Sequence, residues 1–152
     1  MEKLKAVIGI DPGKKGALGL FAGLNSKIDI KDYPNSYTLT YEILNEWVNQ
    51  FNVQSVVLEK VGVVVFGGKK AAFGFGENSG FYEGLLIAMK LPYCRVLPRE
   101  WQKVVDNKSG RTSKERSLNT AQKLFPYYTF KKTKDGRADA ILMAYYGWSR
   151  LL

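Results

Sequence analysis

Hydrophobic residues in the first part of the chain come in short runs separated by turns. The apolar run Lys5–Ile10 (KAVIGI) predicts a buried strand. Asp-Pro-Gly at 11–13 ends it, because proline lacks an amide hydrogen and glycine tolerates positive φ. Ala17–Phe21 and Lys27–Asp32 predict two further strands. Since only short turns separate the three, we expect an antiparallel meander.

The hydrophobic spacing then changes from that of strands to that of a helix. Between Thr40 and Phe51 apolar residues recur every three or four positions, which predicts an amphipathic helix. Ser55–Glu59 (SVVLE) predicts a fourth strand, and Tyr93–Leu97 a fifth. Because a helix leads into the fourth strand, we expect that strand to run parallel to its neighbour.

Two different segments lie between the fourth and fifth predicted strands. The range 61–78 is rich in glycine and lysine and predicts a mobile loop. Ser79–Lys90 predicts a helix with Ser79 as its N-cap. One face of that helix would present four apolar residues to a second copy of the chain: Phe81, Leu85, Leu86 and Met89.

The chain after Pro98 has a helical pattern. We expect a short helix at Pro98–Val105, a polar loop over 106–112, a helix from Ser113 to Leu124, a connector over 125–134 and a last helix at Gly136–Trp148. No repeat or linker divides the chain, so it predicts one domain, 1–152. Its class is α/β, with a mixed five-stranded sheet whose first three strands are antiparallel and whose last two are parallel, flanked by helices.

Composition excludes several kinds of site. The 152 residues include no histidine and one cysteine, Cys94, so the sequence offers no internal disulfide and no Ser-His or Cys-His catalysis. The same absence disfavours zinc and leaves oxygen ligands, which favour Mg²⁺ or Mn²⁺. Without an apolar run of about 20 residues or a signal-peptide pattern, we expect no membrane partner and a cytoplasmic location.

Positive charge is concentrated in the last third of the chain. The net charge is +9, and the range 101–152 holds 11 basic and four acidic side chains. A one-sided basic surface suits a polyanion such as nucleic acid. The alternative is a solubilising surface without a specific partner.

Four carboxylates carry the candidate chemistry. Asp11 and Glu59 end the first and fourth predicted strands, so parallel strands would bring both to one edge of the sheet. Asp135 and Asp139 share a face of the last helix, which is otherwise apolar there. Alone, Asp-Pro-Gly is ordinarily a turn, and acids at a helix start can simply favour its dipole. Together the four predict a site for one or two divalent ions, about 3.5–4 Å apart when paired, that activates water at a phosphodiester.

Three motifs resemble the RuvC-type Holliday junction resolvases, which have a ribonuclease H-like fold: GIDPGKKGALGL at 9–20, VVLEK at 56–60 and DGRADAILMAYYG at 135–147. The resemblance covers nearly the whole chain and is closest to phage and organellar members. It implies a five-stranded mixed sheet, a homodimer, and a four-way DNA junction cut by paired nicks. It also implies Mg²⁺ or Mn²⁺ on Asp11, Glu59 and Asp139. Asp135 matches the remaining ligand, at the organellar spacing of four residues from Asp139.

The resemblance also implies that basic residues after the fifth strand approach the scissile phosphate. Lys103 and Lys114 fit those places, and their alternative is simple phosphate contact or solvent exposure. From the residues themselves we expect further DNA contacts at Lys69, Lys70, Phe73, Phe75, Lys108, Arg111, Lys131, Lys132 and Lys134. The two phenylalanines would stack on exposed bases, or alternatively cover the core or a dimer contact. Phe125 and Phe130 are expected to pack inside.

These features favour a junction-resolving endonuclease. A broad debranching nuclease acting on forks and flaps, and a non-catalytic junction-binding protein, remain alternatives. The four carboxylates argue against the non-catalytic protein. An actin-like ATPase, which shares an Asp-rich first turn, would need two such domains and a longer chain.

Overall fold

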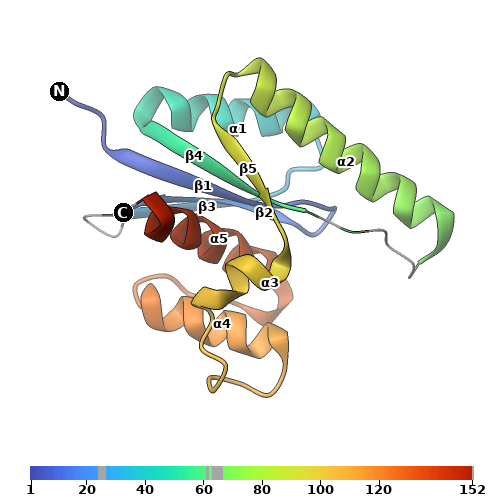
Figure 1. Cartoon of the computed structure of the whole chain (residues 1–152), viewed down its shortest axis with the longest axis vertical. Coiled ribbons are helices and arrows are strands. Elements are labelled where there is room, and N and C mark those ends of the chain that lie inside the picture. Colours follow the sequence, from blue (N-terminus) through green and yellow to red (C-terminus); the bar gives the residue numbers. More distant parts are fainter. Residues whose placement is uncertain (24–26, 61, 63–66, 152) are drawn as a thin grey trace.

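One five-stranded sheet forms the centre of the molecule in a computed structural model that describes residues 1–23, 27–60, 62 and 67–151. The strand order is β3-β2-β1-β4-β5 (Figure 1). β1 pairs antiparallel with β2, as β2 does with β3, while the pairs β1–β4 and β4–β5 are parallel. The predicted sheet is therefore confirmed, with strands at Lys5–Asp11, Ala17–Ala22, Lys27–Asp32, Asn52–Glu59 and Tyr93–Val96.

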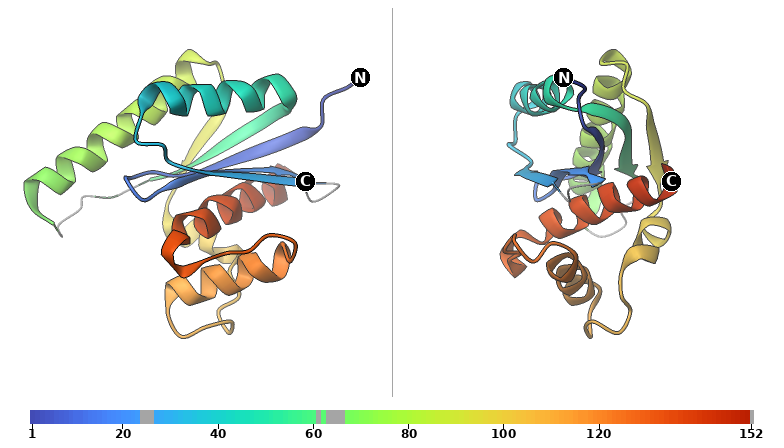
Figure 2. Two further views of the ribbon diagram at one scale, coloured as in Figure 1. Left: turned by 180° about the vertical axis from the view of Figure 1, so that it is seen from behind. Right: turned by 90° about the vertical axis from the view of Figure 1, so that its left-hand side faces the viewer.

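Helices cover both faces of this sheet. α1 and α2 lie on one face, while α5 crosses the other and α4 packs beyond α5 (Figures 1 and 2). The helical elements are α1 (Tyr37–Gln50), α2 (Gly68–Ala88), α3 (Pro98–Trp101), the 3-10 turn η2 (Gln102–Val104), α4 (Ser113–Leu124), the 3-10 turn η3 (Lys132–Lys134) and α5 (Asp135–Leu151). Within the described part of the chain, no helix is long and apolar enough to cross a membrane.

Alternation along β1 assigns its side chains to two separate cores. Ala6, Ile8 and Ile10 pack in the core under α1 and α2, whereas Val7 packs in the core under α5. Gly9 shares the side of Val7, and a Cβ built there would lie only 2.6 Å from the backbone nitrogen of Ala144. α5 therefore lies directly on the strand, and by the same alternation Asp11 belongs to the α5 side.

The prediction of a loop over 61–78 is wrong for residues 68–78, which the structure places in a helix. Residues 61 and 63–66 lie outside the described part of the chain, but α2 already begins at Gly68 after an N-cap at Gly67. Ser79 is therefore inside the helix and is not its cap. Each glycine destabilises a helix by only about 1 kcal/mol relative to alanine, so tertiary contacts can override this preference. Here Asn78 supplies one, since its Oδ1 accepts a hydrogen bond from the backbone of Gly13 at 3.1 Å.

Local capping explains where α1 and α4 begin. Ser36 caps α1 by accepting a hydrogen bond from the Leu39 backbone, so that helix starts before Thr40. Thr112 caps α4 in the same way, by accepting a hydrogen bond from the Glu115 backbone, so this helix begins at Ser113 as predicted. The predicted helix Pro98–Val105 is divided into α3 and η2.

Candidate active site

Asp11 and Glu59 leave neighbouring parallel strands at the same edge of the sheet. Ile10 is paired with Leu58 in the β1–β4 register, and the two acids are the next residues. Val57 packs on the α5 side, so alternation places Glu59 on that side as well. The two carboxylates that the sequence placed together therefore share an edge and a face.

The first turn of α5 brings the second pair of acids to this edge. Gly136 is buried, and a Cβ built on it would be 2.6 Å from the Lys15 carbonyl oxygen and 3.2 Å from Asp11 Oδ2. Only glycine allows the helix start to approach the carboxylate of Asp11 so closely. Asp135 precedes this glycine, and Asp139 lies one turn further along the helix.

The four carboxyl groups are close enough to repel one another. Burial raises the pKa of Asp11 well above its ordinary value, and the charges of Asp139, Glu59 and Asp135 raise it further. Burial, followed by the charge of Glu59, raises the pKa of Asp139 to about 7. Burial also raises the pKa of Glu59. Such mutual repulsion in partly buried acids is what a bound cation would relieve.

The donor chemistry fits a hard divalent cation, although the carboxylates do not form a tight cluster in this structure. Within the described ranges, no three acidic or cysteine side chains are gathered tightly enough to form a ready-made metal site. Carboxylate oxygens are nevertheless the ligands that Mg²⁺ and Mn²⁺ prefer.

Three side chains hold these carboxylates in place. The sequence analysis did not predict a site role for Trp101 or Ser117, and it expected Lys114 at the scissile phosphate. Trp101 donates a hydrogen bond from Nε1 to Glu59 Oε2 at 2.6 Å. Ser117, on α4, hydrogen-bonds Asp139 and lowers its pKa. Lys114, one turn earlier on α4, forms an ion pair with Asp135, its Nζ 3.1 Å from Oδ2. The signal that could have found Trp101 is a tryptophan in the short helix after the fifth strand, because an indole that packs in a core needs a partner for its N–H.

The two lysines expected at the scissile phosphate differ in their surroundings. Lys114 is bound to Asp135 but remains largely exposed. Lys103 is exposed on η2, two residues after Trp101. Both lysines belong to segments that contact the carboxylates, α4 through Lys114 itself and the α3–η2 segment through Trp101.

The N-terminal half of α2 carries the expected aromatic and basic contacts. Lys69 and Lys70 are exposed in its first turn, and the side chain of Phe73 is 70% exposed. Phe75 is half-buried, and its ring lies against the turn at Gly13. Phe73 is thus free to meet a partner, whereas Phe75 covers the turn that carries Asp11.

The C-terminal half of α2 carries the four residues expected at a dimer face. Leu86 is fully buried in the core under α1 and α2, so it cannot meet a partner. Phe81, Leu85 and Met89 pack against that core but are only partly buried, so a dimer contact through these three stays a prediction. On the other side of the sheet, the expected packing of Phe125 and Phe130 is confirmed.

The remaining basic candidates surround α4 and the start of α5. Lys108, Arg111, Lys131 and Lys132 are exposed. Lys134 instead pairs with Asp32, its Nζ 3.2 Å from Oδ2. Asp32 also accepts two hydrogen bonds from Arg137, at 2.7 and 2.8 Å. Part of this positive charge is therefore used to hold β3 against α5.

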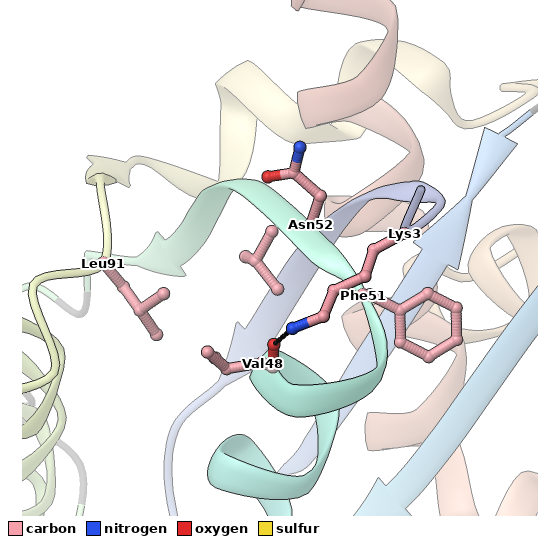
Figure 3. Close-up of a pocket in the computed structure, with 6 residues that line it drawn as sticks. Lys3, Val48, Phe51, Asn52 and Leu91 are labelled. Atoms are coloured by element: carbon pink, nitrogen blue, oxygen red, sulfur yellow. Dashed lines mark hydrogen bonds between the residues drawn. The ribbon is translucent and has the colours of Figure 1, made fainter. Parts of the chain in front are cut away.

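A hollow lies at the opposite end of the strands from Asp11 and Glu59, and none of the candidate site residues lines it. Lys3, Val48, Phe51, Asn52, Val53 and Leu91 line it, and Lys3 Nζ donates to the Val48 carbonyl across it (Figure 3). This hollow lies at the start of β4, whereas Asp11 and Glu59 lie at the ends of their strands. The charged site and the hollow are distinct.

Several solved structures with a similar fold are Holliday junction resolvases. No protein-family model and no curated protein sequence matches the chain. In structure, it resembles RuvC of T. thermophilus in complex with a Holliday junction substrate, with a TM-score of 0.66 and 16% identity over 97% of this chain and 96% of that one.

Two further structures, from a mitochondrion and a virus, are similar. The yeast mitochondrial Holliday junction resolvase Ydc2 has a TM-score of 0.59 and 16% identity, covering 99% of this chain and 80% of its own. The Fowlpox virus resolvase, solved with Holliday junction DNA, has a TM-score of 0.55 and 16% identity, covering 96% and 99%. The fold of this chain is that of the RuvC-type Holliday junction resolvases.

Proposed function

We propose that this chain is a divalent-metal-dependent endonuclease that resolves four-way DNA junctions by paired nicks. The observation that carries the proposal is the convergence of Asp11, Glu59, Asp135 and Asp139 at one edge of a sheet with the resolvase fold. The similar structures from T. thermophilus and Fowlpox virus, which contain junction DNA, support this substrate.

In this proposal the four carboxylates hold Mg²⁺ or Mn²⁺. When bound, the ion supplies an activated water and balances charge on the phosphodiester. Asp11 and Glu59 provide ligands from strand ends, and Asp139 adds one from α5. Lys103 and Lys114 contribute positive charge beside the phosphate, while Ser117 orients Asp139.

The proposed DNA surface extends from the site in two directions. Lys108, Arg111, Lys131 and Lys132 provide exposed charge around α4, and Lys69, Lys70 and Phe73 lie on α2. Phosphate contacts of this kind give affinity that falls steeply with salt. Paired nicks require two sites, so we also propose a homodimer. Light scattering at micromolar concentration should give about twice the 17.1 kDa chain mass.

A junction-cleavage assay tests the function directly. A labelled four-way junction, a fork, a flap and a linear duplex are each incubated with the protein and Mg²⁺ or Mn²⁺. We expect symmetric cuts in the junction, fastest among the four substrates, and none with Asp11→Asn. Glu42→Gln, which removes an exposed acid on α1, serves as the control.

The other outcomes distinguish the alternatives. Equal rates on junction, fork and flap would identify a broad debranching nuclease. Tight junction binding without cutting in either metal would identify a non-catalytic binding protein. Cutting that Asp11→Asn leaves unchanged would remove the basis of the proposed site.

A further inference from the structure

Trp101 lies beside the acidic site without belonging to its charged groups. It ends α3 and is only 1% exposed, packed in the core under α5 with Val57, Val96 and Ile141. A buried indole brings a large apolar surface and one donor that needs a partner. That partner is the Oε2 of Glu59, 2.6 Å away.

Backbone hydrogen bonds fix the segments that carry Glu59 and Trp101. The Lys60 amide donates to the Val96 carbonyl at 2.7 Å, which extends the parallel pairing of β4 and β5 past Glu59. The amide of Leu97 donates to Glu100 Oε2 at 2.8 Å, which fixes the start of α3. The indole is therefore presented to Glu59 by a segment that cannot easily shift.

A glutamate at a strand end is flexible unless something holds it. Fixing its rotatable bonds costs up to about 1.5–2 kcal/mol of conformational entropy. Trp101 occupies one carboxylate oxygen of Glu59, and the other oxygen accepts no side-chain hydrogen bond from the described residues. Partners of this kind orient ligands and commonly change metal affinity tenfold or more when removed.

We propose that Trp101 is a positioning residue that holds Glu59 in the orientation in which it shares a divalent cation with Asp11 and Asp139. The inference rests on the proposed function, because it assigns a metal to these acids. It predicts that the indole N–H acts on metal binding through Glu59 alone.

The chain contains a matched control for this hydrogen bond. Trp47 is also 1% exposed, and its Nε1 donates to Asp29 Oδ2 at 2.8 Å. It packs in the core on the opposite side of the sheet. Trp47→Phe therefore removes an indole–carboxylate hydrogen bond and a similar buried volume, but leaves the acidic site intact.

The experiment measures Mn²⁺ affinity by titration calorimetry of the full chain without DNA, together with the urea midpoint. Trp101→Phe and Trp47→Phe should lower the midpoint by similar amounts. Only Trp101→Phe should also weaken Mn²⁺ binding, by about tenfold. In a Glu59→Gln background, Trp101→Phe should produce no further weakening.

Each result supports or overturns the inference. Equal Mn²⁺ affinities in the two tryptophan variants would overturn it, and so would additive losses with Glu59→Gln. Weakened binding in Glu59→Gln but not in Trp101→Phe would overturn the inference and leave the proposed function standing. Unchanged binding in Glu59→Gln would overturn the metal role of Glu59, and the inference with it. If Trp101→Phe fails to fold, benzothienylalanine at position 101 keeps the ring shape, removes the N–H donor and is judged by the same measurements.

Discussion

Lys114 forms an ion pair of 3.1 Å with Asp135, whereas Asp139, one turn further along α5, is held by the neutral hydroxyl of Ser117. The two acids on one helix face therefore differ electrostatically. Asp139 retains the repulsion that a cation would relieve, and Asp135 is already partly compensated. We infer that the two contribute unequally to metal binding.

The first prediction compares these two acids. Asp135→Asn should reduce junction cleavage by about ten- to a hundredfold, the range for residues that support a metal site. Asp139→Asn should reduce it more and also weaken Mn²⁺ binding more strongly. Single-turnover rates and calorimetric titration measure both effects. Equal losses in the two variants would contradict the inferred difference.

Lys114 provides a related prediction with a matched control. Lys114→Met removes the partner of Asp135, so it should slow cleavage while leaving the fold intact. Lys123→Met changes an exposed lysine in the last turn of the same helix and should leave the rate unchanged. Rates at several salt concentrations separate a local role from general attraction of DNA, because only the latter weakens steeply with salt.

The raised pKa of Asp139 predicts how metal-free stability depends on pH. The folded protein keeps a proton on this carboxyl up to a pKa of about 7, while the unfolded chain releases it near its ordinary value of 3.8. Between these values the folded state binds more protons, so the free energy of unfolding falls as pH rises. The slope from one such group reaches at most about 1.4 kcal/mol per pH unit.

Urea unfolding in EDTA at pH 5 and pH 8 measures this effect. Wild-type protein should be more stable at pH 5, and Asp139→Asn should reduce the difference. Adding Mn²⁺ at pH 8 should restore stability, since a ligand of the folded state alone stabilises it. A wild-type protein that is more stable at pH 8 without metal would contradict the prediction.

The sheet and its acidic edge could be predicted because they follow from local patterns. Apolar runs and short turns gave the first three strands, and the intervening helix indicated that β4 runs parallel to β1. Once two strands are parallel neighbours, residues that end them, such as Asp11 and Glu59, must meet at one edge. That part of the candidate site therefore required no knowledge of long-range packing.

The remaining parts depend on contacts between residues far apart in sequence. The beginning of α2 was missed because its glycines suggested a loop, while the bond between Asn78 and Gly13 joins positions 65 residues apart. Trp101 and Glu59 are separated by 42 residues, and Arg137 and Asp32 by 105. Hydrophobic periodicity along the sequence does not indicate which distant residues form such pairs.

Two glycine substitutions should have opposite effects on stability, because Gly9 lies directly under α5 whereas Gly80 has open space around it. Gly9→Ala would place a methyl group 2.6 Å from the backbone of Ala144, and overpacking of this kind costs about 1–3 kcal/mol. A Cβ at Gly80, inside α2, has no neighbour within 4 Å, so Gly80→Ala should stabilise the protein by about 0.5–1 kcal/mol. Urea unfolding measures both. Stabilisation by Gly9→Ala would contradict the direct contact between α5 and β1.

Arg137 joins the end of β3 to the first turn of α5, the turn that carries Asp135. Its Nε and a terminal nitrogen donate to the two oxygens of Asp32 at 2.7 and 2.8 Å, and Tyr128 accepts a third hydrogen bond at 3.1 Å. Lysine cannot reproduce this two-pronged geometry. Arg137→Lys should therefore lower the free energy of unfolding by about 1 kcal/mol, as an ion pair of good geometry at a partly exposed site is worth.

The pH dependence of this loss identifies its cause. The hydrogen bonds from Arg137 lower the pKa of Asp32 to about 2, below its ordinary value of 3.8. Their contribution is complete above about pH 4 and disappears as pH falls through 2, so wild type and Arg137→Met should differ at pH 6 and converge near pH 2. Lys134→Met removes a single, half-exposed partner of Asp32 and should have a smaller effect at every pH. If Lys134→Met proved equally destabilising, general charge balance would explain the stability of this corner. If Arg137→Met alone also slows cleavage at pH 8, the two-pronged contact holds the start of α5, and with it the acidic site, in place.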